Sequence, residues 1–269
     1  MPCELGASIL LKARDLFAAT LPQDLYRKLV RRKFIWFALD DVDRNVDILY
    51  LYHSLEPISM GTQIRRQTLL INMNQTPEQL FDGIQKDAKY KIKRAEREGV
   101  SFVALASPSA EDIYELIMAH RDLEIRENRN PLTEAALNSF GENRQFVITK
   151  SLGTNDKPIS WHGYVAFEQR VRLLLSITLL VDRTSSSEKN FAGRANRFHH
   201  WKDIVYFKEQ GLKVFDFGGW VGPDGDPKQR SISEFKEGFG GQVADCYDAV
   251  IPVTKRGAFA VWLRKVLQR

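Results

Sequence analysis

The chain has 269 residues, of which 43% are hydrophobic and 27% are charged. This composition excludes an intrinsically disordered protein, because enough apolar surface is present to offset the entropy lost on folding. The formal net charge of +5 favours anionic partners such as phosphates, nucleotides, RNA or an acidic membrane surface, without choosing among them. Cys3 and Cys246 are too few and too far apart for a disulfide scaffold or a zinc site, which indicates a reducing, cytoplasmic location.

The first part of the chain is predicted to contain one helix and three strands. Residues 1–22 have the pattern of an amphipathic helix that the mature protein retains, because Glu4 precedes the apolar part and no basic leader is present. Strands are expected near residues 34–39, 46–55 and 65–73. A basic cluster precedes the first strand, and it is explained either by a solvated face or by a phosphate or membrane contact. Its members are Arg27, Lys28, Arg31, Arg32 and Lys33.

Residues 76–99 are predicted to form one amphipathic helix, with Thr76 as N-cap, Pro77 at the first helical position and Gly99 as the stop. Four apolar side chains share one face of this helix and four basic side chains share the opposite face. The apolar set is Ile84, Ala88, Ile92 and Ala95, and the basic stripe is Lys86, Lys89, Lys93 and Arg97. The stripe supports one alternative for the whole chain, a non-catalytic module that binds RNA or a membrane surface.

The remaining elements indicate a mixed α/β sheet. Two helices are expected at residues 110–127 and 131–140, followed by an antiparallel meander of three strands at 144–150, 158–169 and 170–180. A polar loop at 185–190, which offers amides and hydroxyls to a phosphate or simply faces solvent, precedes a helix at 191–211 and a strand at 213–217. A helix at 231–239, a strand at 242–253 and a helix at 256–269 complete the chain.

Residues 215–241 hold seven of the 17 glycines, and they surround two charged residues with a possible chemical role. Asp216 ends a buried strand just before Gly218 and Gly219. Its carboxylate either closes a turn onto backbone amides, or lies at a sheet end where ligands bind and orients or deprotonates an incoming amine. Lys236 stands between Phe235 and Phe239, and it is either a surface lysine or the group that stabilises the oxyanion of an acyl-transfer intermediate.

The five histidines do not have the spacing of metal ligands, and no metal is expected. His199 and His200 are adjacent, so on a helix they point about 100° apart and would not share an ion easily. A packed or surface role is therefore favoured for the histidines. His162, on the central strand of the meander, is the one expected to face a cleft.

Two stretches of this sequence resemble Fem-type aminoacyltransferases. TLLINMNQTPEQLFDGIQKDAKYKIKRAEREGV resembles the segment that begins the acyltransferase half of those proteins. RANRFHHWKDIVYFKEQGLKVFDFGGW, followed by ISEFKEGFGG, is similar to the Ala-Asn helix, the Tyr/Phe-Asp-Phe-Gly-Gly strand and the Phe-Lys-x-x-Phe-Gly-Gly box of the family. Order and spacing agree over about residues 68–250.

The resemblance implies a GNAT-like acyltransferase fold, a mixed and mostly antiparallel twisted sheet flanked by helices. It implies transfer of an aminoacyl group from aminoacyl-tRNA to the amino group of a peptidoglycan precursor, with no bound cofactor. An acyl-CoA N-acyltransferase acting on a small molecule is the alternative on the same fold, although SSSEKNFAGRAN matches a pantetheine-binding loop poorly.

Carried over by motif, Phe235 and Lys236 are the donor-end residues, and Asp216, Gly218 and Gly219 line the cleft. In such a cleft the catalytic residues are Lys236, which faces the developing negative charge, and Asp216, which handles the amine. The residues expected to bind substrate are Phe235, Gly218, Gly219, Phe239, Asn196 and His162. The chain departs from the family because the part before residue 83 is too short for a full first module. We therefore expect residues 1–82 to form a truncated module, packed on an acyltransferase domain at residues 83–269.

Overall fold

The computed structural model describes residues 30–37, 45–126, 146–179 and 185–267. Contacts between Cα atoms divide the chain into two compact units. The first contains residues 69–242, and the second joins residues 30–68 to residues 243–267. Whereas the sequence divided the chain once, after residue 82, this grouping places the C-terminal strand and helix with the first strands.

The first unit is built on the last residues of β3 and on five further strands, in the order β3-β8-β7-β6-β5-β4. Strands β4, β5, β6 and β7 pair antiparallel, while β7 and β8 pair parallel. The predicted meander and the predicted mixed sheet are therefore both confirmed. The strands are β3 (Thr62–Asn72), β4 (Ser101–Leu105), β5 (Phe146–Leu152), β6 (Pro158–Phe167), β7 (Arg170–Thr178) and β8 (Val214–Gly219).

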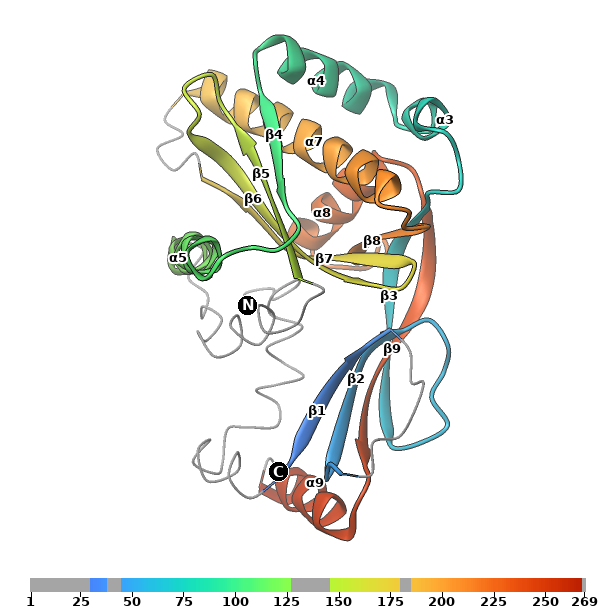
Figure 1. Cartoon of the computed structure of the whole chain (residues 1–269). Helices are drawn as coiled ribbons and strands as arrows, with labels where there is room; N and C mark the ends of the chain where they lie inside the picture. Colours follow the sequence, from blue (N-terminus) through green and yellow to red (C-terminus); the bar gives the residue numbers. More distant parts are fainter. Residues whose placement is uncertain (1–29, 38–44, 127–145, 180–184, 268–269) are drawn as a thin grey trace. The chain divides into compact units, whose positions relative to one another are not determined.

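Helices cover both faces of this sheet. The long helix α7 (Ser186–Glu209) contacts β4, β5, β6 and β7, and α4 (Lys86–Arg97) packs beside it (Figure 1). On the other face, a Cβ atom built on Gly163 of β6 would meet Leu116 of α5 (Ala110–Arg126) at 3.4 Å. The short helices α3 (Pro77–Asp82) and α8 (Pro227–Glu237) complete the unit. The core includes Leu69, Ile92, Tyr164, Phe207 and Phe215, all with at most 2% of their surface exposed.

The predicted helix at residues 76–99 is two helices in the structure. The expected capping box is present, because Thr76 Oγ1 accepts from the Gln79 amide and Gln79 Oε1 accepts from the Thr76 amide. Gly83 then ends α3, and α4 starts after Gln85, whose amide donates to the Gly238 carbonyl at 3.0 Å. The Gln85 amide therefore bonds to a residue far away in the sequence, where a continuous helix would have bonded it to the carbonyl four residues earlier. The predicted burial of the apolar face and the stop at Gly99, with φ +80°, are confirmed.

Two other element starts differ from the prediction because polar residues cap helices there. Helix α7 begins at Ser186, since Ser185 accepts from the Glu188 amide and Glu188 reaches back to the Ser185 amide. Residues 186–190 are therefore helical and not loop. Helix α8 begins at Pro227 because Asp226 accepts from the Lys228 and Gln229 amides. The helices expected at residues 1–22 and 131–140 lie outside the described residues, as do Arg27 and Lys28.

The second unit contains strands in the order β1-β2-β9, followed by the first residues of β3. Strand β1 (Arg32–Trp36) is parallel to β2 (Ile48–Ser54), which is antiparallel to β9 (Gln242–Pro252). Buried Leu49, Leu51, Ala249 and Ile251 form its core cluster, and α9 (Lys255–Leu267) ends the described chain. Among the helices of the described residues, none combines the length and the apolar composition that crossing a bilayer requires.

Candidate active site

Helix α7 presents polar side chains to the sheet where an apolar face would be expected. Asn196, His199, His200 and Asp203 follow the i, i+3, i+4, i+7 spacing, so they share one face of the helix. His199 and Asp203 are fully buried, His200 is 2% exposed and Asn196 is half-buried. Buried polar groups are costly unless they are hydrogen-bonded, so this face requires partners on the strands below it.

Those partners come from β5 and β6. Ser160, His162 and Tyr164 alternate along β6, so their side chains point to the same side of the sheet. Thr149 of β5 lies directly beside His162 in the register. All four residues are completely buried. The strand residues and the face of α7 together make one internal polar network.

Asp203 is the acceptor at the centre of this network. Thr149 donates its hydroxyl hydrogen to Oδ1 at 2.7 Å, and Tyr164 donates to Oδ2 at 2.7 Å. Burial, followed by the charge of Asp203, raises the pKa of Tyr164, so the phenol keeps its proton and remains a donor. His162 Nδ1 also lies 2.7 Å from Oδ2, where a carboxylate oxygen requires a donor. His162 therefore carries a proton on Nδ1.

His199 is fixed by a separate chain of hydroxyl groups. Because Thr149 gives its hydrogen to Asp203, its oxygen accepts from His199 Nε2 at 2.9 Å. His199 Nδ1 then accepts from Ser160 at 2.7 Å, and Ser160 lies 2.6 Å from Ser151. Burial holds the pKa of His199 well below its usual range, so the ring is neutral. Both of its ring nitrogens are occupied by this structural role.

His162 Nε2 faces the one exposed residue of the network. Ser176 pairs with His162 in the register of β6 and β7, and Ser176 Oγ lies 3.0 Å from Nε2. The Ser176 residue is exposed, whereas His162 has no exposed surface. Asn196 Oδ1 also approaches Nε2, at 3.2 Å. With its proton on Nδ1, His162 accepts from the Ser176 hydroxyl at Nε2, and the Asn196 amide fits the same nitrogen in the orientation that turns Nδ2 toward it.

The three imidazole rings form a stack with His162 in the middle. Its ring centroid lies 3.7 Å from that of His199 and 4.1 Å from that of His200. His200 also contacts Phe217, Phe235 and Phe239, with centroids 5.3 to 5.7 Å apart. Burial and then nearby positive charge hold the pKa of His200 well below its usual range, and its Nδ1 has no hydrogen-bond partner among the described residues.

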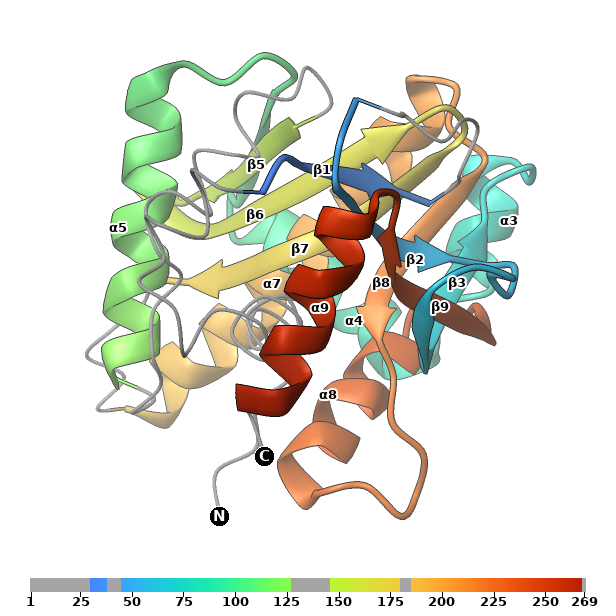
Figure 2. The ribbon, with the colours of Figure 1, turned by 90° about the horizontal axis from the view of Figure 1, so that it is seen from below.

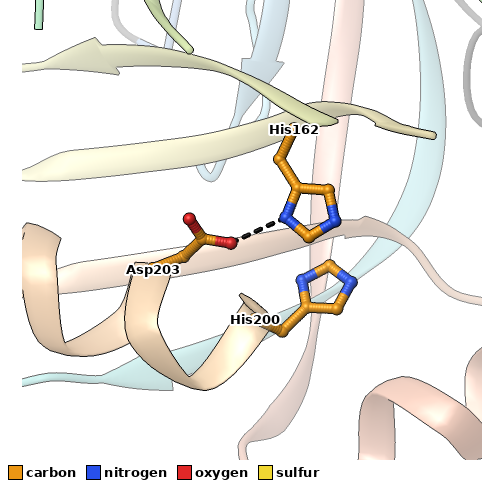
Figure 3. A group of neighbouring side chains, drawn as sticks. All are labelled: His162, His200 and Asp203. Carbon is orange, nitrogen blue, oxygen red and sulfur yellow. Dashed lines mark hydrogen bonds and ion pairs between the residues drawn. The ribbon is translucent and has the colours of Figure 1, made fainter. Parts of the chain in front are cut away.

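His162, His200 and Asp203 offer ligand atoms that lie within 4.8 Å of one another (Figure 3). Two features favour a hydrogen-bonded cluster over a set of metal ligands. His162 Nδ1 is already bonded to Asp203, and both oxygens of Asp203 accept hydrogen bonds. The rings of His162 and His200 are stacked at 23°, so their nitrogen lone pairs lie in two nearly parallel planes, an arrangement unlike the convergent ligands of a tetrahedral ion. The absence of a metal stays a prediction.

Next to this network, the parallel strands β7 and β8 separate. Their register covers only three pairs and ends at Arg172 and Asp216, although β7 continues to Thr178 and β8 to Gly219. Figure 2 shows the arrowheads of β7 and β8 pointing in different directions. We call the region where β7 and β8 diverge, beyond the pair Arg172 and Asp216, the fork. Ser176 lies on its β7 side, and Gly218 and Gly219 lie on its β8 side. Ligands of α/β proteins bind at such carboxyl ends of parallel strands.

Asp216 holds the base of the fork together. Its carboxylate is completely buried and contacts both guanidinium groups opposite it, with Arg172 Nη1 3.0 Å from each oxygen and Arg170 Nη2 beside Oδ2. The Gly218 amide donates to Oδ1 at 2.7 Å, which is the turn contact considered from the sequence. This arrangement favours the turn-closing role for Asp216 over that of a base for an amine.

Lys236 lies at the other side of the fork, in the last turn of α8. It is half-buried, and Nζ donates to the Gly219 carbonyl at 2.6 Å. Burial, followed by the positive charge of Arg172, lowers the pKa of Lys236 to about 8, while Asp216 acts in the opposite sense. The ammonium is therefore neither locked in an ion pair with a carboxylate among the described residues nor extended into bulk water.

The structure brings together the residues singled out from the sequence. Asn196 and His162 are in contact, His200 links His162 to Phe235 and Phe239, and Lys236 joins Gly219. Sequence reasoning missed the core of the polar network, namely Asp203, Ser176, Thr149 and Tyr164. The available signal was the i, i+3, i+4, i+7 spacing of polar residues 196, 199, 200 and 203 on the helix predicted at 191–211.

Comparison with solved structures gives the fold. The chain matches the crystal structure of FemX with a TM-score of 0.57 and 10% identity, over 83% of this chain and 75% of that one. It matches L-PGS from Bacillus licheniformis with a TM-score of 0.50 and 12% identity, over 82% and 73%. No protein-family model matches the sequence, and no curated protein sequence matches it. The predicted architecture, a mixed sheet flanked by helices, is confirmed, and it is the fold of FemX.

Proposed function

We propose that this protein is an acyltransferase that forms an amide between an activated aminoacyl or acyl donor and an amino-group acceptor. The Fem-like form of the reaction uses aminoacyl-tRNA as donor and the amine of a peptidoglycan precursor as acceptor. The proposal includes a cytoplasmic location and no bound cofactor. It is supported by the fold shared with FemX, by the two sequence stretches that resemble the Fem family, and by the chemistry of the fork.

The observation that carries the proposal is the presence of a base beside one strand of the fork and of a cation beside the other, since His162 contacts Ser176 of β7 and Lys236 contacts Gly219 of β8. Attack of an amine on an ester or thioester carbonyl creates a negative oxygen and an ammonium that must lose a proton. His162 Nε2, oriented by Asp203 through Nδ1, is built to accept that proton. The Lys236 ammonium is built to stabilise the developing oxyanion, and Phe235 and Phe239 supply an apolar surface beside it.

The proton balance closes without a further group. The proton that His162 takes from the amine passes to the departing oxygen or sulfur of the carrier, as the carbonyl re-forms and the bond to the carrier breaks. Asp203 accepts hydrogen bonds from Thr149, His162 and Tyr164, and its role in the reaction is to orient His162. In this account Asp216 is a positioning residue that fixes Arg170, Arg172 and the Gly218 turn.

The direct experiment supplies the folded protein with total aminoacyl-tRNA, or with acyl-CoA thioesters of several chain lengths, and a panel of amines. Mass spectrometry detects the amide. We expect amide formation with aminoacyl-tRNA and a rate about 10²-fold lower for Lys236→Met, the scale of losing one oxyanion donor. Lys228→Met is the matched control, since Lys228 is exposed at the other end of the same helix.

Each other outcome has a defined meaning. Turnover with acyl-CoA alone would assign the protein to the N-acyltransferase alternative. Salt-sensitive binding of uncharged tRNA or anionic vesicles through Lys86, Lys93 and Arg97, with no amide from either donor, would favour the non-catalytic module. These three side chains are exposed on α4, as that alternative requires. Full activity of a folded Lys236→Met variant would contradict the proposed role of the lysine.

A further inference from the structure

Ser176, His162 and Asp203 have the arrangement of an activated hydroxyl nucleophile. Such a nucleophile is recognised by a hydroxyl within about 2.6–3.2 Å of a base that a third group orients. Ser176 Oγ lies 3.0 Å from His162 Nε2, and His162 Nδ1 lies 2.7 Å from Asp203 Oδ2. The three residues come from β7, β6 and α7, so the arrangement depends on the fold and not on a local motif.

The surrounding contacts set the tautomer that such chemistry requires. Thr149 and Tyr164 each donate a hydrogen bond to the Asp203 carboxylate. A carboxylate oxygen can only accept, so the third contact requires a proton on His162 Nδ1. Nε2 then accepts from the Ser176 hydroxyl, and the Asn196 amide beside it is oriented with Nδ2 toward this nitrogen. The stacked rings of His199 and His200 lie on either side of His162 and hold its plane.

The burial pattern separates the base from the reacting atom. His162 and Asp203 have no exposed surface, whereas Ser176 is exposed. Hydrogen bonding to His162 does not require the Ser176 hydroxyl to be exposed, whereas reaction with a ligand does. Its position beyond the last β7–β8 pair places it on the fork where the donor carbonyl is proposed to bind.

We propose that Ser176 accepts the acyl group from the donor, so that transfer proceeds in two steps through an acyl-serine ester. This inference rests on the proposed function, because it specifies how the same transfer takes place. It adds a covalent intermediate to a reaction that a direct attack of the amine would also complete.

Both steps balance. In the first, Ser176 Oγ attacks the donor carbonyl and its proton passes to His162 Nε2. The bond from the carbonyl to the carrier then breaks, and the carrier oxygen or sulfur leaves with that proton. In the second step the acceptor amine attacks the ester and gives its proton to His162. Ser176 Oγ leaves and recovers its proton from Nε2.

A test independent of donor identity uses a fluorophosphonate probe, which forms a bond from phosphorus to an activated serine oxygen and releases fluoride. We expect the native chain to be labelled, and peptide mapping to place the label on Ser176. Ser176→Ala should abolish labelling, while Ser101→Ala, at an exposed serine on β4, should leave it unchanged. Ser176→Ala is not expected to unfold the protein, because the side chain is small and exposed.

A second measurement follows the acyl group itself. The chain is incubated with p-nitrophenyl acetate without an amine, and its intact mass is measured. We expect one acetyl group on Ser176, a thioester in its place in Ser176→Cys, and no adduct at this position in Ser176→Ala. With the donor that supports amide formation, Ser176→Ala should lose about 10³-fold or more of the turnover, the scale of removing such a nucleophile.

The outcomes separate this inference from the proposed function. Amide formation at the native rate by Ser176→Ala, or absence of any label on Ser176, overturns the covalent step and leaves direct transfer in place. Labelling of Ser176 without amide formation from aminoacyl-tRNA or acyl-CoA supports the activated serine and contradicts the proposed amide-forming function.

Discussion

The lowered pKa of Lys236 predicts an alkaline limit to activity that an arginine at this position should remove. With a pKa of about 8, the side chain is about 90% protonated at pH 7 and about 10% protonated at pH 9. If the ammonium stabilises the oxyanion, kcat/KM should fall about tenfold for each pH unit above 8. A lysine at its ordinary pKa of 10.5 would show no such fall until far higher pH.

Lys236→Arg tests this reasoning because a guanidinium stays protonated over the whole accessible range. We expect a lower absolute rate, since the larger planar group alters the geometry, but a flat profile between pH 8 and 10. Initial rates of amide formation are measured from pH 6 to 10, corrected for spontaneous donor hydrolysis. Lys228→Arg, in the same helix, should keep the native profile. A native profile that is flat to pH 10, or the same decline in Lys236→Arg, would refute the role given to this ammonium.

Three further changes test the site by stability. Asp216→Asn removes the carboxylate that faces two buried guanidinium groups, and it should lower the free energy of unfolding in urea by about 3–5 kcal/mol. The control Asp245→Asn should lower it by about 1 kcal/mol or less, because its partner Arg65 is exposed. Equal losses would contradict the buried ion pair. Gly218→Ala should destabilise the protein by about 1–2 kcal/mol, because the φ of residue 218 is +78°. Gly193→Ala, inside α7, should instead stabilise it by about 0.5–1 kcal/mol, and the opposite order of the two effects would contradict the turn at Gly218. Excess Zn²⁺ should leave the melting temperature unchanged, and a rise that is lost in His200→Ala would show that the histidine cluster binds metal after all.

Local patterns were enough to predict most helices and strands of the described chain. The alternation in residues 144–180 indicated three strands of a meander, and the capping pattern at Thr76 located a helix start. The break after Gly83 was not predictable, because it depends on a hydrogen bond from Gln85 to Gly238, far away in the sequence. Element identity is a local property here, whereas the exact course of a helix is set by tertiary contacts.

The histidines show why half of the site escaped the sequence. His199 and His200 point about 100° apart, which argued against shared chemistry. A helix buries a stripe about 100° wide or wider, however, and both residues fall within the stripe defined by Asn196 and Asp203. Their common partner, His162, comes from another element, so the stack could not be inferred from spacing alone.

The glycine-rich stretch was interpreted more successfully because its residues lie close together in the sequence. The turn after β8 brings Gly219 to Lys236, and Gly218 adopts the positive φ that only glycine accepts readily. The partners of Asp216 were hidden because the parallel register of β7 and β8 sets them, and parallel strands need not be adjacent in the sequence.

The structure of the protein with a non-hydrolysable analogue of its donor, an amide in place of the reactive ester or thioester, tests the central claim most directly. We predict that the donor carbonyl lies in the fork between β7 and β8. Its oxygen should be within about 3 Å of Lys236 Nζ, and its carbon should be on the side of Ser176 and His162. An analogue seated elsewhere, with Lys236 still bonded only to Gly219 and Ser176 untouched, would contradict the account.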